Sequence, residues 1–253
     1  MLDIIGVEKS FGGVKAVNGC SLSVEEGTIT GLIGPNGAGK TTLFNVITGY
    51  YKPDRGDILF LGQSIAGLGP HQIFKRKMYR TFQITREFPQ MTVLENLMLM
   101  PEHQTGEKLW NSWFRSAAVR RQELEIKEKA LEVLEFVELI DLKDEYAGSL
   151  SGGQKKLLEL ARSMMAEPKM VLLDEPGAGI NPTLMRKLMT KIEKLCEEEH
   201  ITFLLIEHDM ELVMNLCNPI IVMSEGKKLA QGAPEEIKSD ERVLEAYLGG
   251  QYR

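Results

Sequence analysis

Short apolar segments separated by turn signals dominate the first 65 residues of the chain. They predict strands at Leu2–Val7, Ser21–Val24, Thr28–Ile33 and Asp57–Leu61, with turns at Glu26–Gly27 and Pro53–Gly56. A helix from about Lys40 to Thr48 interrupts these strands. Gly49 follows it in the position where glycine commonly ends a helix. This part of the chain is therefore expected to be a β-rich region built around one helix.

The middle of the chain has the period of helices. Between residues 122 and 139, apolar side chains recur at spacings of three and four, while Glu and Lys fill the opposite face. A further helix begins at Ser151 and carries its own apolar face. Because the helical pattern holds from Thr92 to about Met165, this segment predicts a helical insert.

Beyond this insert the pattern returns to that of buried strands. Met170–Leu173 and Ile201–Ile206 are continuous apolar runs, and a helix at about 183–198 separates them. Runs that are apolar on both faces and separated by a helix predict a parallel sheet covered on both sides. The remaining expected elements are a hairpin at Pro219–Gln231, which turns at Glu225–Gly226, and a charged amphipathic helix at Pro234–Leu248.

These elements predict an α/β fold with a mixed or parallel sheet flanked by helices, an N-terminal antiparallel β subdomain and an inserted α-helical subdomain. Strands come from both ends of the chain, so the core is expected to combine residues 1–87 and 166–253. The helical subdomain is expected at about 88–165. A chain of 253 residues is long enough for one large domain with such a subdomain.

Composition narrows the classes of protein to consider. Lys and Arg number 30 and Asp and Glu 36, so the formal net charge is −6. This balance argues against a nucleic-acid binder that relies on general basicity. No apolar run approaches the roughly 18 residues of a membrane helix, and Asp3 and Glu8 stand where a signal peptide is cationic or apolar. With three cysteines at no paired spacing, these features predict a cytoplasmic protein.

One loop carries a phosphate-binding pattern. The strand at 28–33 runs into a segment of the form G-x-x-x-x-G-K-[ST], which comprises Gly34, Pro35, Asn36, Gly37, Ala38, Gly39, Lys40, Thr41 and Thr42. Its glycines let backbone N–H groups face an anion, and the start of the following helix adds partial positive charge. Lys40 would neutralise the β- and γ-phosphates, and the Thr41 hydroxyl would ligate Mg²⁺. A glycine turn without a ligand is the alternative, but the strand–loop–helix context favours a nucleoside triphosphate site.

Two acidic residues end the next buried strand. Asp174 and Glu175 follow Met170–Leu173, which places both at the C-terminal edge of the sheet, where the phosphate loop also opens. Asp174 suits the Mg²⁺ shell, and Glu175 could polarise an attacking water as a general base. The alternative interpretation is a helix cap or a surface acid pair.

A second potential anion site precedes Asp174 in the sequence LSGGQ. Its residues Ser151, Gly152, Gly153 and Gln154 begin a helix, so a hydroxyl and bare backbone amides are available there. Alone, the segment would be a helix cap with a glycine hinge. Because the phosphate loop already serves one nucleotide, a second such helix start suggests the nucleotide of a partner subunit.

The phosphate loop, the LSGGQ segment and the MVLLDE strand, in this order, resemble the nucleotide-binding subunit of ABC (ATP-binding cassette) transporters over nearly the whole chain. The resemblance implies a P-loop NTPase core in a single ABC ATPase domain at 1–253. It implies that two cassettes, as a homo- or heterodimer, close head to tail. Each ATP, with Mg²⁺, would then lie between one phosphate loop and the other cassette's signature, so that Ser151–Gln154 contact the γ-phosphate of the partner's ATP.

The same resemblance implies the remaining partners. They are two membrane-spanning permease subunits and, indirectly, an extracytoplasmic solute-binding protein, with no nucleic acid among them. The chain is accordingly expected to be cytoplasmic and peripheral on the inner face of the cell membrane.

Further positions match the family's motifs one at a time. Phe11 matches the aromatic residue that stacks on adenine, with Ala16 nearby. Gln83, in the sequence RTFQ, matches the glutamine that joins Mg²⁺ to the membrane-subunit interface. His208 matches the switch histidine that contacts the γ-phosphate. Asn181 departs from the pattern, because the family usually has an aspartate in that loop, and the lost charge bears on how the two sites are coupled.

Several segments favour one branch of the family. Arg80–Gln83, Met91–Leu97, Gly177–Pro182 and the insert at about 101–122 resemble ATPases of branched-chain amino-acid importers. Importers of urea or other amides share much of this pattern, and ATPases of lipopolysaccharide export are similar but shorter in the insert. A soluble ABC-type ATPase of DNA repair or translation is the alternative from another class, which the single cassette and the negative net charge disfavour. No residue pattern identifies the solute.

Overall fold

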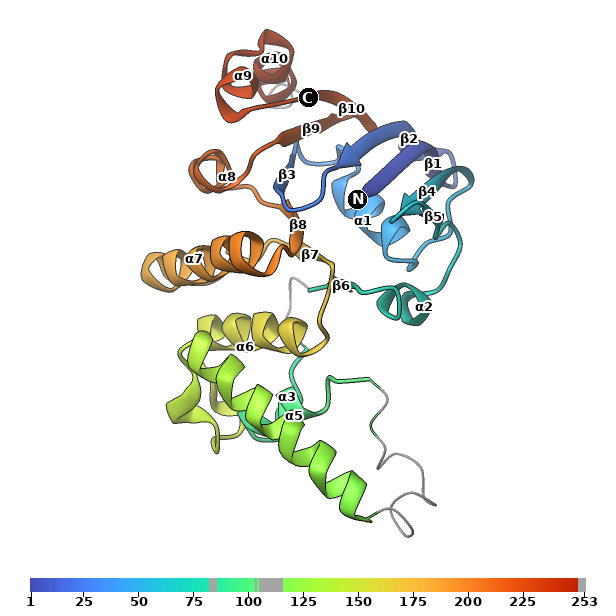
Figure 1. The fold of residues 1–253 in the computed structure, drawn as a ribbon. Coiled ribbons are helices and arrows are strands. Elements are labelled where there is room, and N and C mark those ends of the chain that lie inside the picture. The colour runs from blue at the N-terminus through green and yellow to red at the C-terminus, as the bar shows by residue number, and fades with distance from the viewer. Residues whose placement is uncertain (82–85, 103, 105–115, 250–253) are drawn as a thin grey trace. The chain divides into compact units, whose positions relative to one another are not determined.

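The computed structural model describes residues 1–81, 86–102, 104 and 116–249. The chain divides into two compact units, whose elements are labelled in Figure 1. The first unit comprises Met1–Arg80, Lys169–Pro176 and Ile192–Arg253, and the second comprises Thr81–Pro168 and Gly177–Lys191. Residues 177–191, which belong to the core in the division expected from the sequence, thus group with the helical part of the chain.

A four-stranded antiparallel sheet in the order β2-β1-β4-β5 begins the first unit. Its strands are β1 (Leu2–Phe11), β2 (Val14–Val24), β4 (Arg55–Phe60) and β5 (Gln63–Ser64). Leu2 pairs with Val24 on one side and with Phe60 on the other, so the apolar residues of three strands share one buried face. β1 and β2 extend further than their apolar patterns predict, because the polar residues between them also pair.

The second sheet of this unit is mixed and has the order β10-β9-β3-β8-β7-β6. Its strands are β3 (Ile29–Ile33), β6 (Met78–Arg80), β7 (Met170–Asp174), β8 (Thr202–Ile206), β9 (Ile220–Ser224) and β10 (Lys227–Gly232). β6, β7, β8, β3 and β9 run parallel, and β10 pairs antiparallel to β9. Every residue of β3, β7 and β8 is buried, as expected for strands covered on both faces.

The helices of the first unit connect and cover these strands. They are α1 (Lys40–Ile47), α2 (Pro70–Phe74), α8 (Met210–Leu216), α9 (Pro234–Ser239) and α10 (Glu241–Gly249), together with the last residues of α7 (Pro182–Glu199). α1 packs between the sheets, because its Leu43, Phe44 and Ile47 belong to one apolar cluster with residues of both. The cluster places the apolar face of α1 in the core of the unit.

The sequence predicts one tail helix at Pro234–Leu248, and this prediction is wrong. The structure has two helices, which are separated at Asp240. Asp240 has extended backbone angles, and its side chain accepts hydrogen bonds from the backbone N–H and the guanidinium of Arg242. Asp240 can end one helix and cap the next. The apolar period continues across this break, so the sequence pattern does not reveal it.

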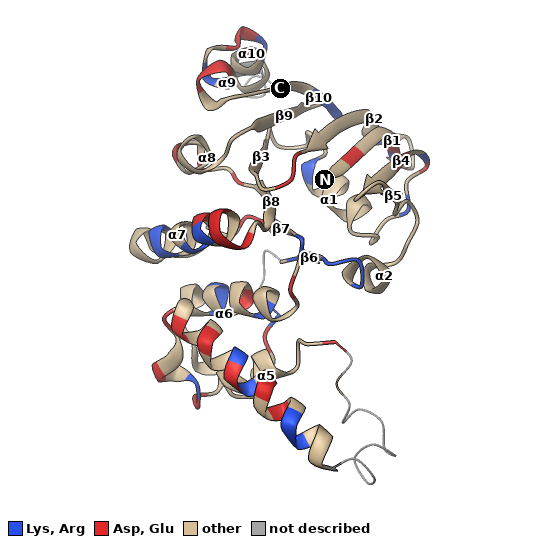
Figure 2. Cartoon of the chain, viewed as in Figure 1, with Lys and Arg blue, Asp and Glu red and all other residues tan. Residues whose placement is uncertain are grey.

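The second unit is helical. Its described residues contain α3 (Val93–Met98), α5 (Ser116–Phe136), α6 (Gly152–Met165), residues 182–191 of α7, and two short 3₁₀ turns at Ile140–Leu142 and Ala147–Ser149. α3, α5 and α6 pack against one another. Figure 2 shows acidic and basic residues along the outer face of α5. The helix expected at 122–139 begins earlier and ends at Phe136, because Glu138 adopts a positive φ of 60°.

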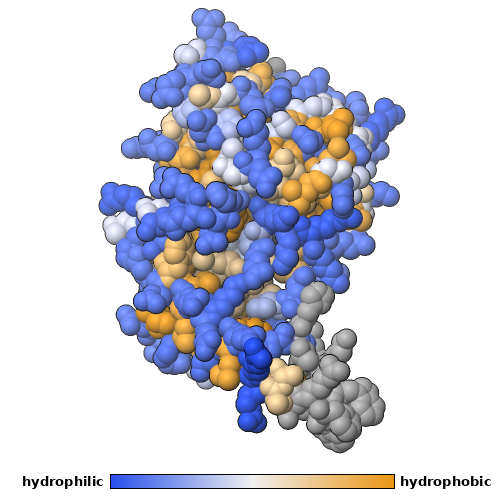
Figure 3. Space-filling model, viewed as in Figure 1, coloured by the Kyte–Doolittle hydropathy of each residue, from blue (hydrophilic) through white to orange (hydrophobic). Residues whose placement is uncertain are grey.

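Polar residues cover most of the surface visible in Figure 3. Among the residues that the structure describes, no helix combines the length and apolar character needed to cross a bilayer. All three cysteines are free and buried. Burial raises the pKa of the Cys20 thiol to about 11 and that of Cys217 to about 12, so both stay protonated and unreactive at neutral pH.

Candidate functional site

The phosphate loop follows buried β3 and leads into α1, in the first unit. Gly34 has a φ of 149°, and a Cβ there would come within 2.1 Å of the carbonyl oxygen of Met223. Gly39 has a φ of 97°, and its Cβ would meet the carbonyl oxygen of Ala16 at 2.2 Å. Only glycine fits such positions, because both the backbone conformation and the space exclude a side chain. Ala16, expected near the adenine, thus lies against the phosphate loop.

A turn from the other end of the unit supports this loop. Gly226, between β9 and β10, donates its backbone N–H to the carbonyl oxygen of Ala38 at 3.0 Å. The carbonyl oxygen of Gly226 accepts the N–H of Asn18 in β2 at 2.9 Å. The turn therefore joins the phosphate loop to the antiparallel sheet. The sequence predicts the turn, but contains no local signal that it contacts the loop.

Lys40 is buried at the start of α1. Its Nζ donates hydrogen bonds to the carbonyl oxygens of Gly34 at 2.7 Å and Pro35 at 3.2 Å. Burial lowers the pKa of Lys40, and the carboxylates of Glu175 and Asp174 act in the opposite direction. The loop therefore holds a cation over its own backbone, within the field of the acidic pair that ends β7.

Two side chains with oxygen atoms, Asp174 and Thr41, suit Mg²⁺. Asp174 ends β7 with a buried carboxylate, and Thr41 contributes an exposed hydroxyl in the first turn of α1. Carboxylate and hydroxyl oxygens are the ligands that Mg²⁺ prefers. Asp174 is also paired with Arg80, a residue that the sequence analysis did not assign to the site. Gln83, the third expected metal contact, lies outside the described residues.

Glu175 and His208 meet at the C-terminal edge of the sheet. His208 Nε2 lies 2.8 Å from Glu175 Oε1, and because a carboxylate accepts, the imidazole N–H donates. β7 and β8 are parallel neighbours with Asp174 opposite Ile206, so the residues that follow them emerge side by side. Glu175 has a positive φ of 50°, and its N–H bonds the carbonyl oxygen of Ile206 at 2.9 Å. A strained backbone that orients a carboxylate is typical of functional positions.

An exposed aromatic pair lies at the end of the antiparallel sheet. Phe11 is 42% exposed and packs edge-on against Tyr51, with ring centroids 5.1 Å apart. The Lys9 ammonium lies 5.6 Å from the Phe11 ring centroid. Phe11 is therefore not a core residue, whereas core aromatics of this unit such as Phe44 are fully buried. An accessible aromatic face can stack on a planar base.

The signature segment belongs to the second unit. Ser151 precedes α6, and its backbone N–H bonds Gln154 Oε1 at 2.8 Å while Gln154 N–H bonds the Ser151 hydroxyl at 3.4 Å. This reciprocal cap leaves Ser151 and Gly152 exposed. A Cβ on Gly153 would lie 2.1 Å from Leu184 Cδ2, so this glycine lets α7 approach α6.

Asn181 has a structural role that the sequence analysis did not assign. Its side-chain oxygen accepts the N–H of Leu184 at 2.9 Å and so caps the start of α7. Asn181, at the position where the sequence resemblance leads us to expect an aspartate, is therefore a helix cap.

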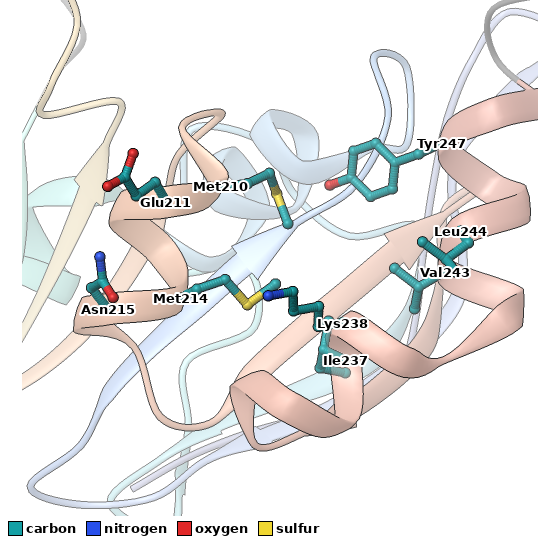
Figure 4. A pocket seen from close by; sticks show the side chains of 9 residues that line it. All are labelled: Met210, Glu211, Met214, Asn215, Ile237, Lys238, Val243, Leu244 and Tyr247. Carbon is teal, nitrogen blue, oxygen red and sulfur yellow. The ribbon is translucent and has the colours of Figure 1, made fainter.

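A cavity of about 490 Å³ lies between α8, α9 and α10. Figure 4 shows Met210 and Met214 on one side of it, and Ile237, Val243 and Tyr247 on the other. Burial raises the pKa of the Tyr247 hydroxyl, and the nearby backbone of Gly34, the first residue of the phosphate loop, acts in the opposite direction. No sequence pattern indicates this contact, because it depends on how the split tail packs.

Structural comparison defines the class of protein. A solved structure described as the ADP conformation of an ATP-binding cassette of an ABC transporter aligns with 98% of this chain and 98% of its own, at 40% identity and a TM-score of 0.83. The fold, with its phosphate loop between β3 and α1, is therefore that of a nucleotide-binding ATPase of the ATP-binding-cassette class, and the predicted α/β fold is confirmed.

Sequence comparison defines the family. The profile described as ABC transporter matches residues 17–178, and that described as Branched-chain amino acid ATP-binding cassette transporter matches 227–253. The high-affinity branched-chain amino acid transport ATP-binding protein BraF of Pseudomonas aeruginosa is 44% identical over 98% of both chains. A probable branched-chain amino acid transport ATP-binding protein, LivG of Archaeoglobus fulgidus, is 42% identical over 99% of this chain and 96% of its own. The chain belongs to the family of ABC transporter ATP-binding proteins.

Proposed function

We propose that this chain is the ATP-hydrolysing subunit of an importer for branched-chain amino acids. The solute is supported by the names of relatives that match almost the whole chain, and by the branch-specific profile at 227–253. The observation that carries hydrolysis is the 2.8 Å contact between Glu175 and His208, in the same unit as the phosphate loop.

The phosphate loop would hold the nucleotide. Its backbone N–H groups and Lys40 would bind the β- and γ-phosphates, and Phe11 would stack on adenine beside Ala16. Thr41, Asp174 and Gln83 would hold Mg²⁺, which when bound neutralises phosphate charge. Lys40 can exchange its bonds to two loop carbonyls for bonds to phosphate oxygens, since its ammonium already lies within the loop.

Glu175 would act as the general base. A water oxygen attacks the γ-phosphorus, its proton passes to the Glu175 carboxylate, and the bond from the γ-phosphorus to the bridging oxygen breaks to leave ADP and phosphate. His208 orients the carboxylate through a hydrogen bond from its Nε2–H. When the nucleotide is bound, the same N–H can instead donate its hydrogen bond to an oxygen of the γ-phosphate. The positive φ of Glu175 holds the base at the edge of the sheet.

The second unit would serve the partner cassette. Ser151 and Gly152 are exposed at the start of α6, where Ser151, Gly152, Gly153 and Gln154 can contact the γ-phosphate bound to another copy or a close paralogue. Closure of two cassettes would then drive two membrane-spanning permeases, with the chain peripheral on the inner face of the membrane. An extracytoplasmic binding protein would deliver the solute, and no nucleic acid takes part.

The variant Glu175→Gln tests both the proposed hydrolysis of ATP and the proposed transport partners. The variant is expected to bind ATP and lose turnover, because glutamine keeps the shape but cannot accept the proton. Glu25→Gln is the matched control, since Glu25 is an exposed carboxylate outside the site. Turnover in Glu175→Gln equal to that of the control would refute the role of Glu175 as base.

Affinity purification of the ATP-trapped variant from native membranes then identifies the partners. Two multi-spanning proteins and an extracytoplasmic amino-acid-binding protein are expected. Vesicles in which these partners are reconstituted with the unmutated chain should take up leucine in an ATP-dependent manner. Uptake of urea instead, recovery of lipid-export components, or recovery of soluble repair or ribosomal proteins would contradict the proposed solute or the transport role.

A further inference from the structure

The guanidinium of Arg80 joins the carboxylate of Asp174 to the far end of α1. Arg80 Nη2 lies 2.7 Å from Asp174 Oδ2, and Nη1 lies 2.6 Å from Asn45 Oδ1 and 3.1 Å from Thr48 Oγ1. The side chains of Arg80 and Asp174 are each only 9% exposed. A buried, charge-assisted contact of this length fixes both groups, because neither can turn to water instead.

Two aromatic rings enclose the same guanidinium. Its carbon lies 5.8 Å from the ring centroid of Phe44 and 5.6 Å from that of Tyr50. Phe44 belongs to α1 and Tyr50 follows it. Stacking on aromatic rings restricts the plane of an arginine, so the fork that bonds Asp174 has a set orientation.

The sheet explains why the two charged residues meet. Arg80 ends β6, which pairs parallel to β7 with Arg80 opposite Leu172. Asp174 lies two residues beyond Leu172 and therefore on the same face of β7. The three-residue edge strand β6 thus places the guanidinium of Arg80 beside the carboxylate of Asp174 at the end of β7.

α1 connects this contact to the phosphate loop. The helix begins at Lys40 and Thr41, directly after the loop, and carries Asn45 one turn further on. Thr41 and Asp174 lie on different elements, yet both are expected to contact one Mg²⁺. Arg80 bonds the helix and the carboxylate at once, and so sets the position of one expected ligand relative to the other.

We propose that Arg80 is a positioning residue for the metal-bound nucleotide: it holds Asp174 Oδ2 and so fixes the carboxylate that, together with the Thr41 hydroxyl, would hold Mg²⁺. This inference rests on the proposed function and assigns a role to a residue outside the expected site. Residues that orient a metal ligand typically alter metal affinity 10- to 100-fold when they are replaced.

A purely structural ion pair predicts a different result. Loss of such a pair would weaken folding and would lower the affinity for ATP equally with and without Mg²⁺. Loss of a positioning residue lowers only the Mg²⁺-dependent part, because the backbone amides and Lys40 still bind metal-free ATP. The ratio of ATP affinity in Mg²⁺ to that in EDTA separates the two roles without any measurement of turnover.

The experiment measures this ratio by calorimetry in a Glu175→Gln background, which prevents hydrolysis. Arg80→Gln is expected to reduce the ratio 10- to 100-fold with metal-free ATP affinity unchanged within twofold. Arg80→Lys should lie between the parent and Arg80→Gln, because a lysine keeps the charge but cannot bond Asp174 and Asn45 with one planar fork. Arg76→Gln is the matched control, since Arg76 lies outside the site and bonds the exposed side chain of Gln63 at 3.0 Å.

Each outcome is decisive. If Arg80→Gln does not fold, Arg80→Lys provides the test, and its ratio must fall severalfold below that of Arg76→Gln. A ratio in both Arg80 variants equal to that of the control overturns the inference. If the parent protein itself binds no ATP in either buffer, the proposed function fails instead, and the two failures are thereby distinguished.

Discussion

The backbone N–H of Gly226 donates a hydrogen bond of 3.0 Å to the carbonyl oxygen of Ala38, which fastens the phosphate loop to the turn between β9 and β10. The loop contains several glycines and would otherwise have a large conformational freedom. A contact that fixes one of its carbonyls also fixes the direction of the neighbouring amides. The contact therefore favours one conformation of the loop.

Gly226→Ala is expected to lower nucleotide affinity severalfold. Gly226 has a φ of 77°, and a Cβ there would lie 3.0 Å from Ala16 O and Asn18 N of β2, so the turn must shift relative to β2 and its bond to the loop is disturbed. Gly62→Ala is the matched control, because Gly62 has a φ of 74° and its Cβ would meet nothing within 4 Å. Both variants bear the backbone cost of about 1 kcal/mol, and calorimetric ATP titration compares them. Equal affinities would show that the turn does not organise the loop.

The sequence is most informative where one short segment contains the whole feature. The phosphate loop is such a case, because the strand, the glycines and the helix start are contiguous from Thr28 to Thr42. Asp174 and Glu175 are another, since a buried strand that ends in acids places them at a defined edge. Fold class, family and these residues were therefore accessible from local patterns.

Features that depend on packing between distant segments were not accessible. β6 has three residues, too few for a period of two, so the position of Arg80 beside Asp174 carries no local signal. The contact of His208 with Glu175 requires the neighbourhood of β7 and β8, which the spacing of residues does not determine. The tail was mispredicted because Asp240 interrupts the backbone without interrupting the apolar pattern.

Phe11→Ala is expected to weaken ATP binding by about 1–3 kcal/mol, the usual contribution of a stacked base. Binding of inorganic tripolyphosphate should be unchanged, because it lacks the base and contacts only the loop. Phe11→Trp should retain ATP affinity. Tyr146→Ala is the control, since Tyr146 is 62% exposed in the second unit. Competition titrations with both ligands distinguish the outcomes, and an equal loss for ATP and tripolyphosphate would contradict the stacking role.

Asn181→Ala is expected to destabilise the second unit by about 1 kcal/mol, because the cap on the Leu184 N–H is lost. Asn181→Asp should preserve or increase stability, since aspartate caps equally well and adds negative charge at a helix start. Urea denaturation of the two variants measures the difference. Equal stability of Asn181→Ala and the parent would show that the cap contributes nothing.

Glu138 gives the second unit a pH-dependent contribution. Hydrogen bonds from Lys187 and Lys191 lower the pKa of this carboxyl to about 2. Because the folded state binds fewer protons than the unfolded state, the contribution is complete above the ordinary pKa of 4.5 and is lost as pH falls towards 2. The side chains of Glu138 and Lys187 are both about half exposed. Glu138→Gln is therefore expected to lower the free energy of unfolding by less than about 1 kcal/mol at pH 7.

At pH 4, the difference in the free energy of unfolding between Glu138→Gln and the parent should be smaller than at pH 7. Glu135→Gln is the control, because Glu135 is an exposed carboxylate of α5 in the same unit. Urea denaturation at both pH values measures these differences. A difference for Glu138→Gln that grows on acidification would contradict a lowered pKa of Glu138.

Tyr247→Phe is expected to destabilise the first unit by about 1 kcal/mol near pH 7, because the polar contact of the Tyr247 hydroxyl with the Gly34 backbone is lost while the ring still lines the cavity. Burial raises the pKa of Tyr247 above its ordinary value of 10. The folded state then holds a proton that the unfolded state releases, so the parent loses stability as pH rises above 10 and the phenylalanine variant does not. The gap between them should therefore narrow in alkaline buffer, whereas Tyr146→Phe, with an exposed ring, should match the parent throughout. Urea denaturation at pH 7 and at pH 10.5 tests this, and a gap that widens at the higher pH would show that burial does not raise the pKa of the Tyr247 hydroxyl.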